Sequence, residues 1–292
     1  MKKLTKFWPQ AALLLVGLIW GSSNVIIKSA VDQIPPAFLI AMRCTIAAPL
    51  LAILFRKHLR GTTAADVRSG AIIGVCLFLA YWIQACSMCY IAPGKSGFLT
   101  SIYCVMVPFV YWAVSRRAPT LRNLLAAGLC VCGVALCSLT GSFTIAWGDT
   151  LALICGLFSA AHVVSVGICG QGRDPFRITV LQFIAAAIVG WGVSLCTEAS
   201  RICLPTGALF DVFYLALACT GLALLLQNIS QQRVEPNTAS ILTSTESVFG
   251  VMFSVLLGYE TLNARLLGGF ALIFAAILVS QLQFPTKERK KE

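Results

Sequence analysis

The sequence predicts an all-α membrane protein in which ten transmembrane helices form two inverted five-helix repeats around a central cavity. Composition, the division of the chain into apolar stretches and an internal repeat support this prediction. Of the 292 residues, 58% are hydrophobic and 11% are charged, whereas ordinary soluble domains are roughly 45–50% apolar and about 25% charged. The mean hydropathy is +0.86.

Hydropathy divides the chain into ten apolar stretches, each near the roughly 20 residues that a helix needs to cross a hydrocarbon core about 30 Å thick. Strands of a membrane barrel would be about half as long and would alternate in polarity, so the pattern indicates helices. Short turns that carry Pro or Gly separate the stretches, as at Ile34-Pro35-Pro36. The predicted spans are 8–28, 36–55, 69–91, 95–115, 121–140, 149–169, 177–197, 208–231, 237–258 and 264–284.

The formal net charge of +11 is distributed unevenly between the two sides of the predicted membrane. If the N-terminus lies inside, 17 of the 22 Lys and Arg residues lie inside and four lie outside. Cytoplasmic loops carry such an excess of positive charge. We therefore expect both termini in the cytoplasm, including a basic tail at 285–292, and we expect no binding to nucleic acid.

Two pairs of segments repeat along the chain. GKSGFLTSIYCVMVPF at 94–109 aligns with NTASILTSTESVFGVM at 237–252, and LLAAGLCVCGVALCS at 124–138 aligns with LLGGFALIFAAILVS at 266–280. The alignment predicts two five-helix units, at 8–141 and 148–284. Because five is odd, the second unit enters the membrane from the opposite side. Inverted repeats of this kind are typical of alternating-access transporters, whose site lies near the midplane between the halves.

Polar residues in the spans fall on single helix faces, because residues three or four apart share a face. Trp20 and Asn24 are four apart, while Thr100 and Tyr103 are three apart. Ser and Thr in such helices can instead bond to a neighbouring helix, and packing alone could explain His162. The candidate substrate-binding residues are Trp20, Asn24, Tyr81, Gln84, Thr100, Tyr103, His162, Gln227, Thr243 and Glu246.

Glu246 is the candidate coupling residue. It aligns with Tyr103 in the repeat, and each residue lies about 12–14 Å from the start of its helix at a rise of about 1.5 Å per residue. A charge at that depth costs roughly 2.5–3.5 kcal/mol, so such residues usually serve transport. Glu246 could hold a substrate ammonium group opposite the aromatic face of Tyr103, or exchange a proton for substrate. A third possibility for Glu246, that it only ties its helix to a neighbouring helix, stays open. For Arg43, which also lies within a span, both a structural ion pair and substrate binding stay open.

Enzymatic motifs do not occur. The sequence contains neither His-Glu-x-x-His nor Gly-x-Ser-x-Gly, and no Asp-rich metal cluster, so we expect no enzyme, no cofactor and no metal site. Gly94-Lys95-Ser96 resembles the end of a phosphate-binding loop, but Cys89 stands where that motif needs glycine.

Other residues have simpler interpretations. Most of the 13 cysteines lie in spans, where Cys behaves as a small hydrophobe; Cys196 and Cys203 could pair on the outer side. Gly70-x-x-x-Gly74 has the spacing of a helix-packing motif. Asp149 is interpreted as a helix N-cap.

Several motifs together resemble one family over nearly the whole chain. They are LIWGSSNVIIKSA at 18–30 with Pro35-Pro36 and Arg43, GKSGFLTSIYCVMVP at 94–108, Gly148-Asp149, the stretch from Gln227 to Pro236, and TESVFG at 245–250 with GYETLNARLLGG at 258–269. With these motifs the chain resembles the drug/metabolite transporter superfamily, specifically the ten-helix EamA-type transporters. It departs from them at Ser247, where the family often has proline.

The resemblance implies a multi-pass secondary carrier in the inner (plasma) membrane of a bacterium, which exports amino acids or other small metabolites. A small zwitterion or cation as substrate and protons as coupling ion are the corresponding expectations, and the carrier could be a monomer or a dimer. Two alternatives stay open. One is a non-transporting membrane protein, such as a sensor or assembly factor. The other is a carrier of anionic substrates, for which the spans offer only Lys28 and Arg43.

Overall fold

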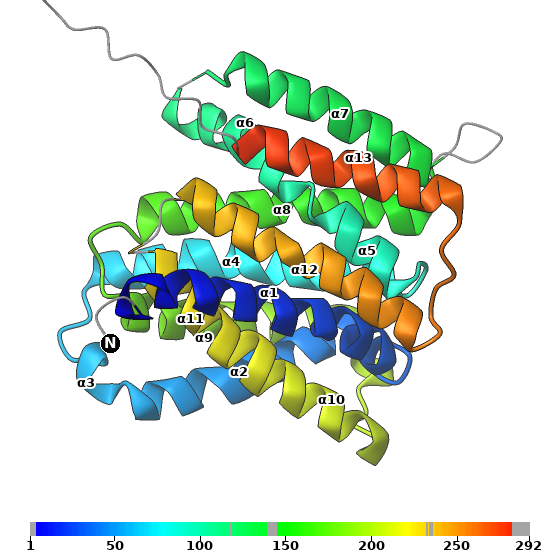
Figure 1. The fold of residues 1–292 in the computed structure, drawn as a ribbon. Helices are drawn as coiled ribbons and strands as arrows, with labels where there is room; N and C mark the ends of the chain where they lie inside the picture. Colours follow the sequence, from blue (N-terminus) through cyan, green and yellow to red (C-terminus); the bar gives the residue numbers. More distant parts are fainter. Residues whose placement is uncertain (1–3, 117, 139–144, 232, 234–235, 282–292) are drawn as a thin grey trace, which may run out of the picture.

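The structure, a computed structural model, describes residues 4–116, 118–138, 145–231, 233 and 236–281, whose regular elements are all helices (Figure 1). The α-helices are α1 (Leu4–Val31), α2 (Pro36–Leu54), α3 (Arg56–Leu59), α4 (Ala64–Met88), α5 (Pro93–Thr100), α6 (Tyr103–Ser115), α7 (Leu121–Ser138), α8 (Trp147–Cys169), α9 (Pro175–Thr197), α10 (Leu209–Tyr214), α11 (Ala223–Gln231), α12 (Pro236–Leu256) and α13 (Ala264–Gln281). Between them lie η1 (Ala199–Arg201), η2 (Thr206–Ala208) and the π-helical η3 (Leu215–Leu222).

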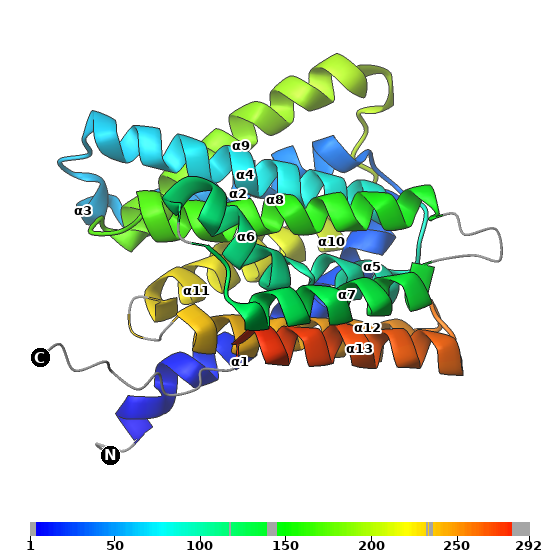
Figure 2. The same cartoon turned by 90° about the horizontal axis from the view of Figure 1, so that it is seen from above.

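Seven spans of the described residues are long and apolar enough to cross a membrane, so the chain is a multi-pass membrane protein. They lie on α1, α2, α4, α5–α6, α8, α9 and the segment from η2 to α11. Shorter apolar helices, α7, α12 and α13, occupy the other three predicted stretches. Helix α1 begins and α13 ends at the same end of the bundle (Figure 2), which fits the even number of passes that the ten-helix prediction needs.

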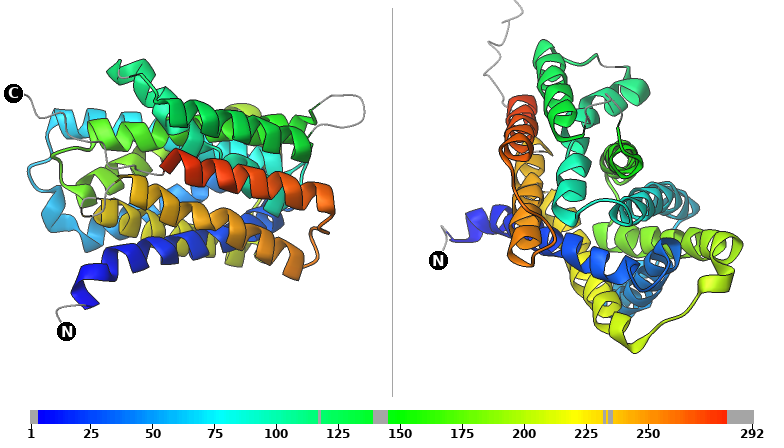
Figure 3. Two further views of the ribbon diagram at one scale, coloured as in Figure 1. Left: turned by 45° about the horizontal axis from the view of Figure 1, so that its top comes forward. Right: turned by 90° about the vertical axis from the view of Figure 1, so that its right-hand side faces the viewer.

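The helices stand side by side as a bundle, which Figure 3 shows from the side and from one end. Its contacts join helices that are far apart in the sequence. Helix α1 packs on α12, α4 packs on α8 and α9, and α2 packs on α9. Helices α7 and α13 form a separate pair at one edge (Figures 1 and 2). The inverted relation between the two halves, 8–141 and 148–284, stays a prediction.

Glycines allow α4 to approach α9 closely. A Cβ atom on Gly70 would collide with the Leu181 side chain, and one on Gly74 would meet the Gln182 carbonyl oxygen and lie 2.7 Å from Ala185 Cβ. Small residues at such contacts let helix backbones approach in a membrane. The spacing of Gly70 and Gly74 is therefore a packing motif, as the sequence indicates.

Two predicted spans are irregular. The span predicted at 95–115 divides into α5 and α6 at a tight turn, where Ile102 N donates to Leu99 O and Val105 N donates to Ile102 O at 2.9 Å. The span predicted at 208–231 contains η3, in which Ala223 N donates to the carbonyl oxygen of Ala218, five residues before it. Hydropathy carries no signal for either feature, because both are local changes of hydrogen-bond pattern within an apolar run.

The first residues of several helices are ones that the sequence marks as helix starts, but one predicted N-cap is wrong. Proline opens α2, α5 and α9, where the missing N–H leaves no bond unmade. The interpretation of Asp149 as an N-cap is wrong, because α8 begins earlier, after Ala146, and the Asp149 carboxylate accepts a bond from Lys95 Nζ at 2.8 Å instead. The thiols of Cys196 and Cys203 are both exposed and unpaired.

Candidate functional site

A single cavity in the middle of the bundle gathers nine of the ten candidate residues. Only Thr243 is absent from its lining. The volume is about 70 Å³, and a single water needs at least about 10–15 Å³. The cavity therefore has room for a few waters. Its lining comprises Trp20, Ser23, Asn24, Ile27, Arg43, Leu77, Ala80, Tyr81, Gln84, Thr100, Tyr103, Ser159, His162, Val163, Leu224, Gln227 and Glu246.

Glu246 brings the acidic group to this lining. It lies in the middle of α12, and its side chain is half-buried. No hydrogen bond or ion pair joins its carboxyl to any of the described side chains. The tie to a neighbouring helix that the sequence left open is therefore not seen among the residues that the structure describes. A carboxyl group placed in this way is available to a molecule in the cavity.

Asn24 is held between three helices. Its side chain is buried, and Gln84 Nε2 on α4 lies 3.4 Å from Asn24 Oδ1. A Cβ atom on Gly97 of α5 would collide with Asn24 Nδ2, and one on Gly250 of α12 would lie 2.7 Å from it. These two glycines therefore make the space in which the amide sits, and they fix its place at the cavity wall.

Arg43 brings the basic group, on α2. The residue is only 2% exposed. Its Nε donates to Thr220 Oγ1 at 2.7 Å, and its Cζ lies 4.5 Å from the centre of the Tyr81 ring. Trp20 is bonded to η3 as well, since its Nε1 donates to the carbonyl oxygen of Cys219 at 3.0 Å. The π-helical turn of η3 thus positions both side chains.

His162 and Tyr103 complete the polar wall, and both are buried. His162 Nε2 lies 3.4 Å from Gln182 Oε1 on α9, so the ring has a structural partner as well as a cavity face. Tyr103 is the first residue of α6, directly after the turn that interrupts its span. That turn places its hydroxyl 3.4 Å from Thr243 Oγ1.

A second space adjoins the cavity and contains Thr243. This vestibule has a volume of about 610 Å³, and it shares Tyr103, Val163 and Gln227 with the cavity. It extends along the end of α8 to the α8–α9 connection, where Arg173 lines it. We call this end of the molecule the Arg173 end, and the charge distribution predicts that it faces the cytoplasm.

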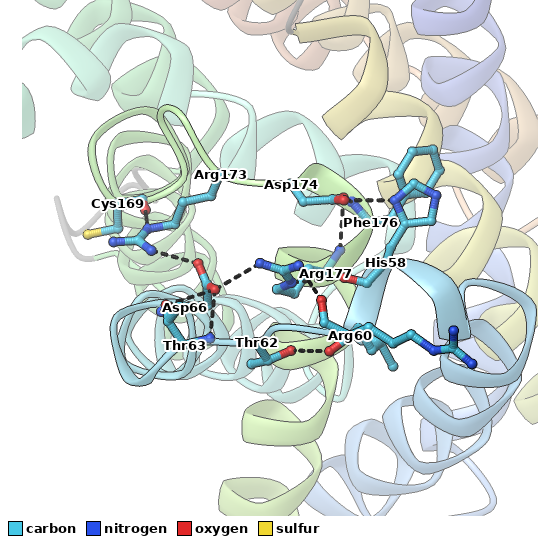
Figure 4. Close-up of polar contacts among 11 residues, drawn as sticks. His58, Arg60, Thr62, Thr63, Asp66, Cys169, Arg173, Asp174, Phe176 and Arg177 are labelled. Atoms are coloured by element: carbon cyan, nitrogen blue, oxygen red, sulfur yellow. Dashed lines mark hydrogen bonds and ion pairs between the residues drawn. The ribbon is translucent and has the colours of Figure 1, made fainter.

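A network of ion pairs and hydrogen bonds joins the helix ends beside the vestibule (Figure 4). Asp66 at the start of α4 pairs with Arg173 at 2.6 Å and with Arg177 at 3.0 Å. Nearby, His58 Nδ1 lies 2.7 Å from Asp174 Oδ2. Burial raises the pKa of the Asp174 carboxyl, but its bonds with His58 and with backbone N–H groups outweigh burial and hold the pKa below its ordinary value. The network ties the α3–α4 connection to the α8–α9 connection.

The opposite end, which we call the Lys95 end, is closed by a tighter cluster. Lys95 on α5 donates to fully buried Asp149 on α8 at 2.8 Å. The Glu260 carboxyl fills the space beside Gly94, where a Cβ atom would collide with it. Burial raises the pKa of the Glu260 carboxyl, and Ser254 and Lys95 oppose this only in part. These contacts hold α5 against α8 and against the α12–α13 connection.

Lys28 and a separate apolar space both lie outside the candidate site. Lys28 does not line the cavity, because its ammonium pairs with Asp32 at 2.8 Å. A separate space of about 620 Å³ between α6, α7 and α8 is lined by apolar residues such as Val105 and Val134. A polar solute would gain nothing in this space, so the polar cavity is the candidate site despite its smaller size.

Arg43 is a charged lining residue that is not among the ten candidates, although the sequence left substrate binding open for it. Its signal was present, since a basic residue within a span is expensive and usually faces a polar interior. Ser159 shares a helix face with His162 by its spacing of three, and only Ser23 was missed for another reason. A serine in a membrane helix commonly bonds to its own backbone, as Ser23 Oγ does with Trp20 O at 2.7 Å, so its sequence gives no evidence of a cavity.

Comparisons with known proteins show the family of the chain. The model of the EamA-like transporter family matches residues 8–139 and again residues 146–281. An uncharacterized transporter of Archaeoglobus fulgidus is 29% identical over 276 residues, which are 94% of this chain and 86% of that protein. An uncharacterized transporter of Haemophilus influenzae is 35% identical over 119 residues, which are 37% of this chain and 70% of that protein.

A solved crystal structure of a protein has the same fold. It superposes with a TM-score of 0.68 at 17% identity and covers 94% of this chain and 96% of that one. At such low identity the likeness concerns the fold alone. Family membership rests on the two family matches, which together cover most of the chain. The chain belongs to the EamA-like transporter family.

Proposed function

We propose that this transporter is a secondary carrier that moves a small zwitterionic or cationic metabolite by alternating access, in the direction of export across the inner membrane. The observation that carries the proposal is the central cavity, in which Glu246 and the aromatic residues Trp20, Tyr81 and Tyr103 share one lining. A carboxylate attracts an ammonium group, and aromatic faces attract cations as well. The lining therefore suits a cargo with a positive group.

The two ends of the bundle fit one state of such a cycle. At the Lys95 end, Lys95 and Asp149 hold α5 against α8. At the Arg173 end, the vestibule of about 610 Å³ adjoins the cavity through Tyr103 and Gln227. If the Arg173 end faces the cytoplasm, as the charge distribution predicts, this state loads cargo from inside. The outward state would need the contacts at the Lys95 end to separate.

Transport itself is tested with the purified chain in lipid vesicles. Vesicles are loaded with an unlabelled extract of small metabolites, and the exchange of labelled amino acids and amines into them is followed by mass spectrometry. We expect at least one solute to enter faster than into protein-free vesicles. A chain that moves no solute of the extract would instead favour the non-transporting sensor or assembly factor.

The place of the site is tested by cysteine protection. Cysteine is introduced singly at Trp20, Asn24, Tyr103 and His162, in a background that lacks the reactive native thiols. We expect a small thiol reagent to modify these positions from the Arg173 end, and a transported solute to slow the modification several-fold. Cysteine at Leu195, an exposed residue of α9 that is not part of the cavity lining, is the control that solute should not protect. Absence of protection at all four positions would show that the cavity is wrongly placed.

A further inference from the structure

Arg43 carries a charge that the described residues leave without a counter-ion. None of them places a carboxylate within ion-pair distance of its guanidinium, although the residue is only 2% exposed. A guanidinium stays protonated in proteins, and an uncompensated buried charge is strongly unfavourable. Because Arg43 lines the cavity, the place where an anion can neutralise it is inside that cavity.

The orientation of the guanidinium is fixed by its neighbours. Nε is occupied by the bond to Thr220 Oγ1 at 2.7 Å, and the Tyr81 ring covers one face at 4.5 Å from Cζ. The two terminal nitrogens remain for a ligand. They form the planar fork that matches a carboxylate with two parallel N–H···O bonds. A fork that is already held in place loses little entropy when an anion binds.

The same lining contains the opposite charge. Glu246 lies on α12 and Arg43 on α2, and the structure shows no ion pair between them. Two unpaired opposite charges on the wall of one cavity form two poles. A molecule that carries both an anionic and a cationic group would satisfy both poles at once, whereas a simple amine would leave the Arg43 pole unpaired.

We propose that Arg43 is a specificity-determining residue that binds the carboxylate of the cargo while Glu246 takes its ammonium group, so that the cavity rejects amines without a carboxylate. This inference rests on the function proposed above and narrows its substrate class to zwitterions. The volume of about 70 Å³, which is room for a few waters, favours a small cargo. Glycine, alanine and serine, with their few non-hydrogen atoms, are the probes of that size.

The selectivity of the unmodified protein is the first test. Vesicles containing the transporter and unlabelled glycine, alanine and serine are placed in a mixture of the same three amino acids in labelled form. Each competitor is the matching amide, which keeps the ammonium group but lacks the carboxylate. We expect rapid exchange, and we expect the amides to inhibit at least ten times more weakly than the amino acids. Equal inhibition by the amides, or no exchange of the three amino acids, would overturn the proposal.

Variants separate a ligand contact from a structural role. We expect Arg43→Gln to reduce amino-acid exchange at least tenfold and to remove the preference over the amides. Thr220→Val deletes the Oγ1 acceptor but keeps the guanidinium, so it should retain that preference. If Arg43 only ties α2 to η3, both variants would lower exchange alike and leave the preference unchanged. If Arg43→Gln does not fold, exchange by Arg43→Lys and the preference of the unmodified protein for amino acids over amides still test whether Arg43 binds the carboxylate.

Failure of this inference differs from failure of the proposed function. A protein that exchanges other solutes of the metabolite extract, but treats amines and zwitterions alike, remains a transporter without the Arg43 selectivity. A protein that exchanges no solute of that extract contradicts the proposed function itself.

Discussion

Glu246→Gln is expected to lose most transport, at least tenfold, while the amount of folded protein in the membrane stays unchanged. Glutamine keeps the size of the side chain and most of its hydrogen bonding but removes the charge. Since a charge deep in a membrane helix costs roughly 2.5–3.5 kcal/mol, its removal should not destabilise α12. The loss would therefore report on function. Exchange and net uptake in vesicles, with protein amount measured in parallel, are the relevant measurements.

The form of the loss separates the two roles of Glu246. If the carboxylate holds the ammonium group of the cargo, the half-saturating concentration rises in both exchange and net uptake. If it carries a proton, uphill accumulation disappears while exchange at equal pH persists. Asp32→Asn is the control, because among the residues that the structure describes this exposed acid pairs only with Lys28, and such surface pairs contribute about 0–1 kcal/mol. A glutamine variant that transports at the wild-type rate at every external pH would exclude both roles.

Gly74→Ala is expected to give a large loss of stability for so small a change. The added methyl group would meet the Gln182 carbonyl oxygen and lie 2.7 Å from Ala185 Cβ on α9, and backbone cannot move aside as a flexible side chain can. Overpacking of this kind costs roughly 1–3 kcal/mol. In a protein stabilised by about 5–15 kcal/mol in total, the midpoint of thermal unfolding in detergent should fall by several degrees.

Gly192→Ala on α9 is the matched control. Nothing lies within 4 Å of its added methyl group, and replacing a helical glycine by alanine is favourable by roughly 0.5–1 kcal/mol. The two substitutions should therefore move the unfolding midpoint in opposite directions. Equal shifts would mean that the contact between α4 and α9 is looser than the structure shows.

The helices and most of the polar cavity could be predicted from the sequence because both depend on periodic patterns. Apolar length fixes where helices cross the membrane, and the spacing of Trp20 and Asn24, or of Thr100 and Tyr103, fixes which side chains share a face. Nine of the ten candidates line one cavity for this reason. Their role in binding a cargo remains a prediction.

The features that escaped prediction depend on contacts between elements distant in the sequence. Arg43 could have been paired with an acid, and only the folded chain shows that its neighbours are Thr220 and Tyr81. The sequence placed Asp149 at a helix start, where it could be an N-cap, but its carboxylate forms an ion pair with Lys95 on another helix. Thr243 follows the face of Glu246 in the sequence, yet it lies in the vestibule. The spacing of residues predicts which side chains share a helix face, but it does not predict which helix packs against that face.

The π-helical turn at 215–222 has a consequence for how this chain can change in evolution. Its five-residue hydrogen bonds accommodate one residue more than an α-helix does, so a deletion there need not break the span. The wide turn holds the extra residue without rotating the helix that follows, so its removal would restore an ordinary α-helix and leave Gln227 on the cavity wall. The local contacts would change instead, because Thr220 and Cys219, which bond to Arg43 and Trp20, lie in this turn. Between related chains, a one-residue gap at this place would therefore alter how Arg43 and Trp20 are held while the rest of the cavity wall stays in register.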